Sequence, residues 1–230
     1  MLMQKIGAGA ADKSIRLAPQ PVPGPASSAL ADAFALMGAS IRFDRNAEIY
    51  GEGEASDYVY KVVSGTVRTY KLLSDGRRQI GGFHLKGDVF GLEAATEHRF
   101  TAEAIANSVV VVVKKSALVA LAARDHDIAR DLWGVTAGDL ERAQDHLLLL
   151  GRKNAQERVA TFLLEMAGRG STEAVVELPM SRQDIADYLG LTIETVSRTL
   201  TQLEDEAAIE IPVSRRILLR NRSALNRLNA

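Results

Sequence analysis

The sequence contains no cysteine among its 230 residues. This absence excludes disulfide bonds, thiolate metal sites, cysteine-ligated iron–sulfur clusters and any thiol switch. Long apolar runs are also missing, since stretches such as Ser108 to Val113 fall far short of the ~20 residues that span a bilayer. The N-terminus lacks the hydrophobic segment of a signal peptide. The sequence therefore predicts a protein that stays in the cytoplasm.

Neither an excess of one charge nor a cluster of histidines is present. The formal net charge is −1, and from residue 151 onward acids and bases number about eleven each. Any positive surface must therefore come from the arrangement of the basic residues. The four histidines, His84, His98, His126 and His146, are scattered along the chain, with none within two residues of another. They do not supply the clustered ligands of a metal-dependent cupin enzyme, so we expect no enzymatic activity, metal or cofactor.

The most informative stretch is residues 180–203, MSRQDIADYLGLTIETVSRTLTQL. Ser181 precedes an apolar-periodic run and has Asp184 three residues later, which is the spacing of a capping box at a helix start. Gly190 suits a tight turn, and Thr192 can cap a second helix. This order predicts a helix-turn-helix that binds DNA. A helical hairpin with a solvated polar face is the alternative.

The second of these helices has two different faces. Apolar residues from Val196 to Leu203 recur at helical spacing and form the inward face. Glu194, Ser197 and Arg198 form the outward face and supply an acceptor, a hydroxyl and a forked donor. These groups can read base edges and phosphates in a major groove, so we predict all three as base contacts. The residues predicted as contacts to the DNA backbone or as helix caps are Ser181, Arg182, Thr192, Thr195, Arg215 and Arg216.

A second informative stretch runs from about Asp127 to Leu150. Its seam positions alternate at spacings of three and four, which is typical of a coiled coil. These positions are Trp133, Thr136, Leu140, Ala143, Leu147 and Leu150. We predict that this helix joins two copies of the chain, because two-fold symmetry adds affinity and site selection to a helix-turn-helix protein. A helix packed on its own domain would show the same stripe, and Gly134 and Gly138 weaken the tendency to form a helix.

Composition and periodicity divide the chain into four parts. Residues 1–28 are rich in Ala, Gly, Pro and Ser and are predicted to form a flexible arm. Residues 29–125 are predicted to contain a short helix and then a β-roll or jelly roll, because apolar and polar residues alternate between recurrent glycines. The dimerisation helix is expected at 126–150 and a winged helix-turn-helix domain at 151–230. The predicted fold class is therefore α+β.

Several local turns and ends can also be predicted. The segments Ser64-Gly65 and Ser74-Asp75-Gly76 are typical of hairpin turns. A cap at Asn154 starts a helix that we expect to end at the glycines of residues 168–170. The segments AIEI and RRILLR are predicted as two strands around Pro212, which would form the wing.

This order of elements resembles the CRP/FNR family of bacterial transcription regulators. Four motifs carry the likeness: GTVRTYKLLSDGRRQIGGFHLKGDVFG, GRKNAQERVATFLLEMAGR, LPMSRQDIADYLGLTIETVSR and RRILLRN. They span most of residues 40–222. Within the family the chain is most similar to the FixK-like branch, whose recognition helix carries E-x-x-S-R, here Glu194, Ser197 and Arg198. The resemblance implies a homodimeric activator that reads an inverted repeat of the type TTGAT-N4-ATCAA.

The chain departs from the ligand-binding patterns of other branches. CRP-like members hold cyclic AMP with a Glu after the roll's glycine and with an Arg-Ser pair. Here Leu92 follows Gly91, with Glu93 one residue later, and Phe100 follows Arg99. The cysteine-ligated cluster of FNR-type oxygen sensors cannot form. The resemblance therefore implies activity without a small-molecule effector, and a ligand-gated sensor with a cyclic nucleotide or other metabolite in the roll is the alternative.

The FixK-like resemblance also implies partners and a regulatory setting. Members of this branch activate genes of low-oxygen respiration and nitrogen fixation. An activator binds double-stranded promoter DNA and contacts RNA polymerase. By family position, the loop from Ser74 to Arg78 is the candidate for the polymerase contact. No membrane partner is expected.

Overall fold

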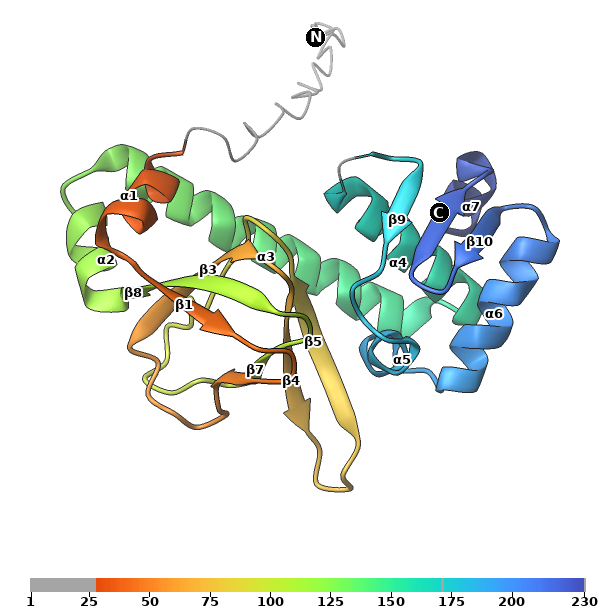
Figure 1. Ribbon diagram of the computed structural model, residues 1–230, viewed down its shortest axis with the longest axis horizontal. Helices are drawn as coiled ribbons and strands as arrows, with labels where there is room; N and C mark the ends of the chain where they lie inside the picture. Colours follow the sequence, from red (N-terminus) through yellow and green to blue (C-terminus); the bar gives the residue numbers. More distant parts are fainter. Residues whose placement is uncertain (1–27, 171, 230) are drawn as a thin grey trace, which may run out of the picture.

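The computed structural model describes residues 28–170 and 172–229 (Figure 1). It confirms the α+β class, with a β-roll at one end, a winged helix domain at the other and a long helix running between them. The expected arm, residues 1–28, lies outside the described residues except for Ser28. The Ser28 side chain accepts a hydrogen bond from the Ala31 N–H and caps α1 (Ala29–Met37). No helix in the described residues is long and apolar enough to cross a membrane.

Two antiparallel sheets form the roll. One has the strand order β1-β8-β3-β6 and the other β2-β7-β4-β5. Their bounds are β1 (Ala39–Phe43), β2 (Glu48–Tyr50), β3 (Tyr58–Ser64), β4 (Val67–Leu72), β5 (Arg78–His84), β6 (Val89–Phe90), β7 (Thr101–Ala104) and β8 (Ser108–Lys114). The strands follow from alternation of apolar and polar residues. In the central pair β3·β8, Val59 and Val113 face a core shared with the helices, whereas Val62 and Val110 face the interior of the roll.

The two predicted hairpin turns have different outcomes. Residues 74–76 do join a hairpin, since β4 and β5 pair along their length. The prediction for Ser64-Gly65 is wrong, because β3 and β4 belong to different sheets. Gly65 has a φ of +84° and lies against Asn107 and Ser108, where a Cβ atom would overlap the backbone. The glycine therefore turns the chain from one sheet into the other, which local sequence cannot distinguish from a hairpin.

After the roll come α2 (Lys115–Ala122) and the long α3 (His126–Arg152). Asp125 caps α3 by accepting hydrogen bonds from the N–H groups of Asp127 and Ile128. The helix continues through Gly134 and Gly138 despite the weak helix propensity of glycine. Its N-terminal half packs on α1 and α2, and its C-terminal end enters the winged helix domain.

The C-terminal part contains four helices and a small sheet. Their bounds are α4 (Ala155–Arg169), β9 (Val175–Glu177), α5 (Arg182–Leu189), α6 (Ile193–Asp205), β10 (Ile209–Val213), β11 (Arg216–Leu219) and α7 (Arg222–Asn229). Asn154 and Glu157 form a capping box at the start of α4. Gly168 lies inside α4, contrary to expectation, and Gly170 is its C-cap.

The wing differs in detail from its prediction. Pro212 does not separate two strands but lies within β10, and the turn follows at residues 214–215. The sheet order β10-β11-β9 places β10 at an edge, where the missing N–H of proline is tolerated. Helix α7 was not predicted, and its Leu225 is buried in the core of the domain. That core also includes Ile80 and Phe83 of β5, so the roll and the winged helix domain share one apolar cluster.

Candidate nucleic-acid interface

Helices α5 and α6 are joined as the local sequence indicates. Ser181 is the N-cap of α5, where its Oγ accepts from the Asp184 N–H (3.1 Å) and its own N–H donates to Asp184 Oδ2 (2.9 Å). Gly190 ends α5 in the left-handed region with a φ of +62°. Thr192 then caps α6 by accepting from the Thr195 N–H at 3.2 Å. The angle between the helices is thus fixed by caps and by one glycine.

Helix α6 presents the three predicted base-contacting residues to solvent. Val196, Leu200 and Leu203 are buried in the domain core, and the opposite face is exposed. Glu194 and Arg198 extend from that face, whereas the Ser197 hydroxyl donates to the Ile193 carbonyl at 2.8 Å. The backbone N–H of Glu194, the Thr192 hydroxyl and the charge of Arg198 lower the pKa of Glu194. The carboxylate is therefore an ionised acceptor at neutral pH, as cytosine recognition requires.

The predicted backbone-contacting residues lie around this helix. Arg215 and Arg216 are exposed at the turn and strand of the wing, and Arg216 Nε lies 3.3 Å from Glu177 Oε1. Arg182 is half-buried and donates from Nη2 to the Ser214 carbonyl at 3.3 Å. It therefore ties α5 to the wing turn. Their roles toward DNA stay predictions.

The predicted dimer seam lies along α3. Trp133, Leu140 and Leu147 are 75%, 59% and 71% exposed, and Thr136 and Ala143 are exposed as well. Leu150 differs from the other five because it is half-buried against the core of the winged helix domain. The structure thus leaves an apolar stripe over most of the predicted seam. Its partner stays a prediction.

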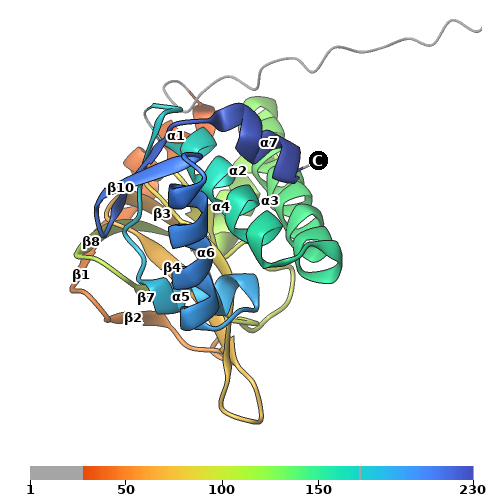
Figure 2. The same cartoon turned by 90° about the vertical axis from the view of Figure 1, so that its right-hand side faces the viewer.

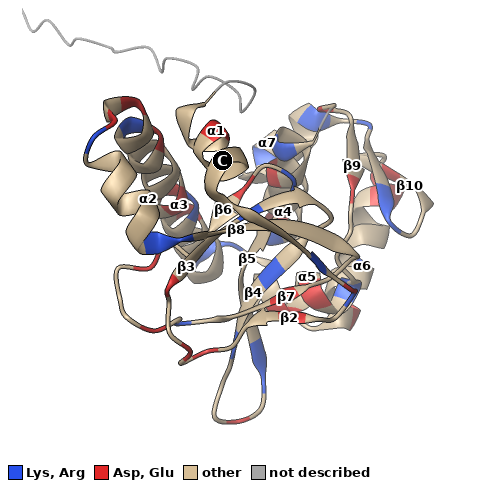
Figure 3. Ribbon diagram, turned by 60° about the vertical axis from the view of Figure 1, so that its left-hand side comes forward, with Lys and Arg blue, Asp and Glu red and all other residues tan. Residues whose placement is uncertain are grey.

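An ion cluster between the roll and α5 was missed by sequence reasoning. Arg68 on β4 lies 2.5 Å from Asp184 and 2.8 Å from Glu103, and Arg78 on β5 lies 2.8 Å from Asp184 and 2.7 Å from Asp187. Figure 3 shows these basic segments of β4 and β5 beside acidic segments of α5 and β7. Local sequence identified Asp184 only as part of a capping box. Its arginine partners are 116 and 106 residues away, and no local pattern indicates them.

The surroundings of Asp184 keep it ionised. Burial would raise the pKa of this carboxyl, but hydrogen bonds from Ser181 and the charges of Arg68 and Arg78 outweigh that effect. The pKa is therefore held below its ordinary value of 3.8. An ionised carboxylate, itself buried, thus lies at the start of the helix-turn-helix and faces the roll.

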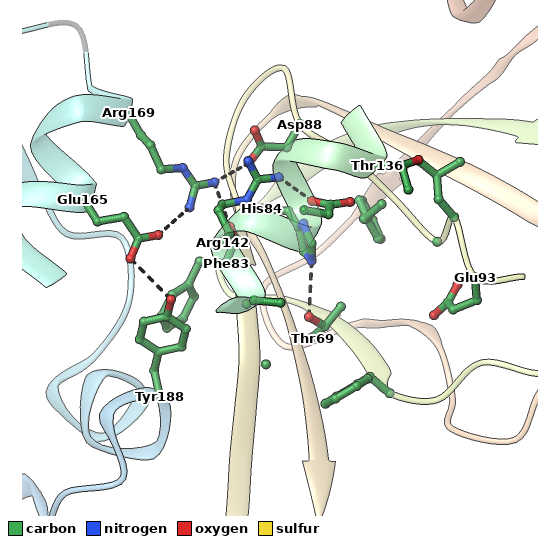
Figure 4. Close-up of a pocket in the computed structure, with 18 of the residues that line it drawn as sticks. Thr69, Phe83, His84, Asp88, Glu93, Thr136, Arg142, Glu165, Arg169 and Tyr188 are labelled. Atoms are coloured by element: carbon green, nitrogen blue, oxygen red, sulfur yellow. Dashed lines mark hydrogen bonds and ion pairs between the residues drawn. The ribbon is translucent and has the colours of Figure 1, made fainter. Parts of the chain in front are cut away.

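A cavity of about 360 Å³ lies between the roll, α3 and α4 (Figure 4). The arginines in its wall are paired with carboxylates. Arg169 contacts Asp88 and also donates to the Phe83 carbonyl at 2.8 Å. Arg142 contacts Asp139. On the roll side it is lined by Leu92, Glu93 and Phe100, whereas Arg99 is exposed. The cavity therefore has no arginine free of a carboxylate partner among its described lining residues.

Burial shifts the pKa of two titratable side chains at this cavity. His84 Nε2 lies 3.3 Å from Thr69 Oγ1, and burial lowers the pKa of His84 to about 4. Burial also raises the pKa of Glu165, which accepts a hydrogen bond from the Tyr188 hydroxyl at 3.3 Å. His84 is therefore a neutral, structural side chain near pH 7.

Comparison with known proteins supports the family that the sequence motifs indicate. The model of the cyclic nucleotide-binding domain matches residues 40–125, and that of the Crp-like helix-turn-helix domain matches residues 157–228. The nitrogen fixation regulation protein FixK of Azorhizobium caulinodans is 55% identical over 205 residues, covering 87% of this chain and 83% of that protein. FixK of Rhizobium meliloti is 44% identical over 181 residues, covering 79% and 82%.

A solved structure is similar over nearly the same range. The structure of FixK2 from Bradyrhizobium japonicum has 56% sequence identity and a TM-score of 0.81, covering 84% of this chain and 98% of that chain. The similarity includes both the roll and the helix-turn-helix, and the identity is far above the level at which only the fold is shared. The chain belongs to the CRP/FNR family of DNA-binding transcription regulators, in its FixK-like branch.

Proposed function

We propose that the protein is a homodimeric transcription activator that binds a TTGAT-N4-ATCAA-like inverted repeat without a small-molecule effector. In this proposal it acts in the cytoplasm and controls genes of low-oxygen respiration or nitrogen fixation, the latter a process that the names of its FixK relatives give for those proteins. The observation that carries the proposal is the exposed set of Glu194, Ser197 and Arg198 on a capped α6.

The chemistry of these three side chains suits the proposed site. The Glu194 carboxylate would accept from a cytosine amino group, and the Arg198 guanidinium would donate to a guanine. The C-cap of α5 and the N-cap of α6 hold both side chains on one exposed face. Two such helices in a dimer would meet half-sites one DNA turn, about 34 Å, apart.

The exposed stripe on α3 supports the dimer. Large apolar side chains rarely remain uncovered along a helix unless a partner buries them. Trp133, Leu140 and Leu147 recur at the spacing of a two-stranded coiled coil, so a second α3 would bury the stripe through knobs-into-holes packing. The occupant that we infer for this face is therefore a second copy of the chain.

The composition of the cavity supports activity without an effector. An anionic nucleotide needs an unpaired cation, yet Arg142 and Arg169 already contact carboxylates. Leu92 and Phe100 place apolar groups where the CRP-like pattern has an acid and a serine. Cyclic nucleotide binding would therefore require this wall to rearrange.

A projecting hairpin supports a contact with RNA polymerase. The tip of β4–β5 extends away from the roll (Figure 2), and Leu72 and Leu73 are both exposed there. The proposed contact is the loop from Ser74 to Arg77. The loop expected from the sequence extends to Arg78, but the guanidinium of Arg78 is held by Asp184 and Asp187 and is not available to a partner.

An effector-free titration tests the proposal. We expect the purified chain to bind a TTGAT-N4-ATCAA duplex more tightly than a scrambled duplex of equal length, by the factor of 10³ or more typical of specific sites. Chromatography with mass measurement should give twice the chain mass. Equal affinity for the two duplexes would contradict the DNA specificity, and a monomeric mass would contradict the dimer.

A ligand-gated sensor is the second candidate, because the cavity lies between the roll and the long helix. In that case a cyclic nucleotide or other metabolite would bind there and change the DNA affinity. Calorimetry with cyclic AMP in the absence of DNA tests this candidate. A saturable heat would favour it, whereas the absence of heat would favour the effector-free activator.

A further inference from the structure

The interdomain ion cluster, made of Arg68, Arg78, Asp184 and Asp187, joins the roll to the first helix of the helix-turn-helix. Asp184 is at its centre and is only 4% exposed. Its carboxylate accepts from Arg68 Nη1 at 2.5 Å, from Arg78 Nη2 at 2.8 Å and from Ser181 at 2.7 and 2.9 Å. One side chain therefore both caps α5 and binds two cations of another domain.

The contacts of each arginine are directional. Arg68 bridges Glu103 of the roll and Asp184 of α5, and Arg78 bridges the two aspartates of α5 with separate nitrogens. A planar guanidinium that contacts two carboxylates fixes angle as well as distance, unlike an apolar contact, which tolerates sliding. The cluster is thus suited to set an orientation and not only to hold two domains together.

The orientation that the cluster sets is transmitted to α6. The far end of α5 is also tied to the roll, since Gln79 Nε2 donates to the Tyr188 carbonyl at 3.3 Å and the Tyr188 ring packs on Phe83. Helix α5 therefore contacts the roll at both ends. Because α5 and α6 share a core and a capped turn, a change in the direction of α5 moves α6 with it.

We propose that Arg68 and Arg78 are positioning residues that set the spacing between half-sites which the dimer accepts. The inference rests on the proposed function, in which two α6 helices read an inverted repeat. Changing the spacer by one base pair moves a half-site by about 3.4 Å and rotates it by about 34°. A rigid link between roll and α5 rejects that change, whereas a loosened link tolerates it.

The substitution of Arg78 and its control lie on the same hairpin, β4–β5. Arg78→Ala removes the contacts to Asp184 and Asp187, and Arg78→Lys keeps a cation that can reach one carboxylate. The control is Lys71→Ala, since Lys71 of β4 pairs with Glu52 of the roll at 2.6 Å and is exposed. Asp187→Asn is a milder variant that weakens one of the two contacts of Arg78 without changing the roll.

The first measurement is affinity for duplexes with spacers of three, four and five base pairs. We expect wild type and Lys71→Ala to prefer one spacer by roughly tenfold or more, within the penalty typical of a mismatched site. Arg78→Ala should reduce that preference to about threefold or less, and Arg78→Lys and Asp187→Asn should fall between. The salt dependence should stay unchanged, because both arginines are paired with carboxylates of the protein and supply no phosphate contact in the proposed complex. A wild-type spacer preference in Arg78→Ala, or in Asp187→Asn if Arg78→Ala does not fold, would overturn the inference.

The second measurement needs no DNA. Because the chain has no cysteine, spin labels can be placed at the exposed positions Lys86→Cys on the roll and Asp205→Cys on α6. With excess unlabelled chain, the distance distribution between the labels should be narrow in wild type and broader in Arg78→Ala. If the distance distribution broadens in Arg78→Ala but wild type binds no inverted repeat, the proposed function fails and the role of the cluster in orienting α6 stands. If wild type binds the repeat but neither spacer preference nor distances change in Arg78→Ala, only the further inference fails.

Discussion

The same residue type has different roles in this chain according to its surroundings. Arg198 extends from α6 into solvent, whereas Arg68 and Arg169 are held by carboxylates from other elements. A guanidinium without a protein partner retains all its donors for a ligand, while a paired one fixes the relation between two segments. Exposure and pairing therefore divide the arginines into those suited to DNA and those suited to structure.

Arg198→Ala should weaken binding to the TTGAT-N4-ATCAA duplex by about 1 kcal/mol or more, because one bidentate contact to a base is lost. Binding to a scrambled duplex should change little. Fluorescence titration of both duplexes measures the difference. An equal loss on both would assign Arg198 to a phosphate contact and not to a base.

His84 should make stability depend on pH between neutral and mildly acid conditions. The ordinary pKa of 6.5 is lowered to about 4 by burial in the folded protein. As the pH falls from 6.5 toward 4, the unfolded state binds a proton that the folded state rejects, so the free energy of unfolding decreases. Between pH 7 and pH 4, it should fall by about 3 kcal/mol more in wild type than in His84→Gln. Urea unfolding of wild type and His84→Gln across that pH range measures both free energies of unfolding. An equally steep decrease in the two proteins would contradict the lowered pKa of His84.

At the scale of elements, α3 is a single helix that contacts both ends of the molecule. Its 27 residues extend about 40 Å, from the contacts with α1 and α2 to the core of the winged helix domain. Only Ile128 and Leu149 along it are buried. Most of its apolar stripe is exposed, so the presence of the helix does not by itself establish a dimer seam.

Leu147 and Leu148 allow a matched test of the seam. Leu147 lies on the predicted seam and is 71% exposed, while Leu148 lies off it and is 59% exposed. Leu147→Lys should raise the dimer dissociation constant at least ~100-fold, because two buried leucines contribute about 3 kcal/mol or more. Leu148→Lys should leave it nearly unchanged. Sedimentation analysis distinguishes the two, and an equal effect of both substitutions would contradict the proposed seam.

At the scale of the whole molecule, DNA binding must come from charge arrangement, because the net charge is only −1. The basic residues of the wing and of α6 lie in the same domain, while Arg68 and Arg78 of the roll are occupied by carboxylates. A steep salt dependence can arise from such a local patch, since each neutralised phosphate releases counterions.

Arg215 provides a test of this arrangement. In a dimer, Arg215→Ala removes two phosphate contacts, so the slope of log affinity against log salt should become shallower by about 2. Specific and scrambled duplexes should weaken alike, because a phosphate contact carries no sequence information. The control is Arg124→Ala at the far end of the roll, which should leave the slope unchanged. A loss confined to the specific duplex would assign Arg215 to a base.

The sequence by itself determined the parts whose signals lie within a few residues of each other. The capping boxes at Ser181 and Asn154, the turn at Gly190 and the exposed face of α6 follow from spacing and side-chain chemistry, because a helix and its caps are local structures. Four sequence motifs were also sufficient to indicate the family, which the comparisons confirm.

Only the tertiary structure decided how distant segments meet. Ser64-Gly65 has the composition of a hairpin turn, yet strand pairing across the roll places β3 and β4 in different sheets. Asp184 has the spacing of a cap, yet its burial and its two arginine partners depend on how the roll docks against α5. Such contacts join residues more than a hundred positions apart, and their energy depends on burial and packing that no local pattern contains.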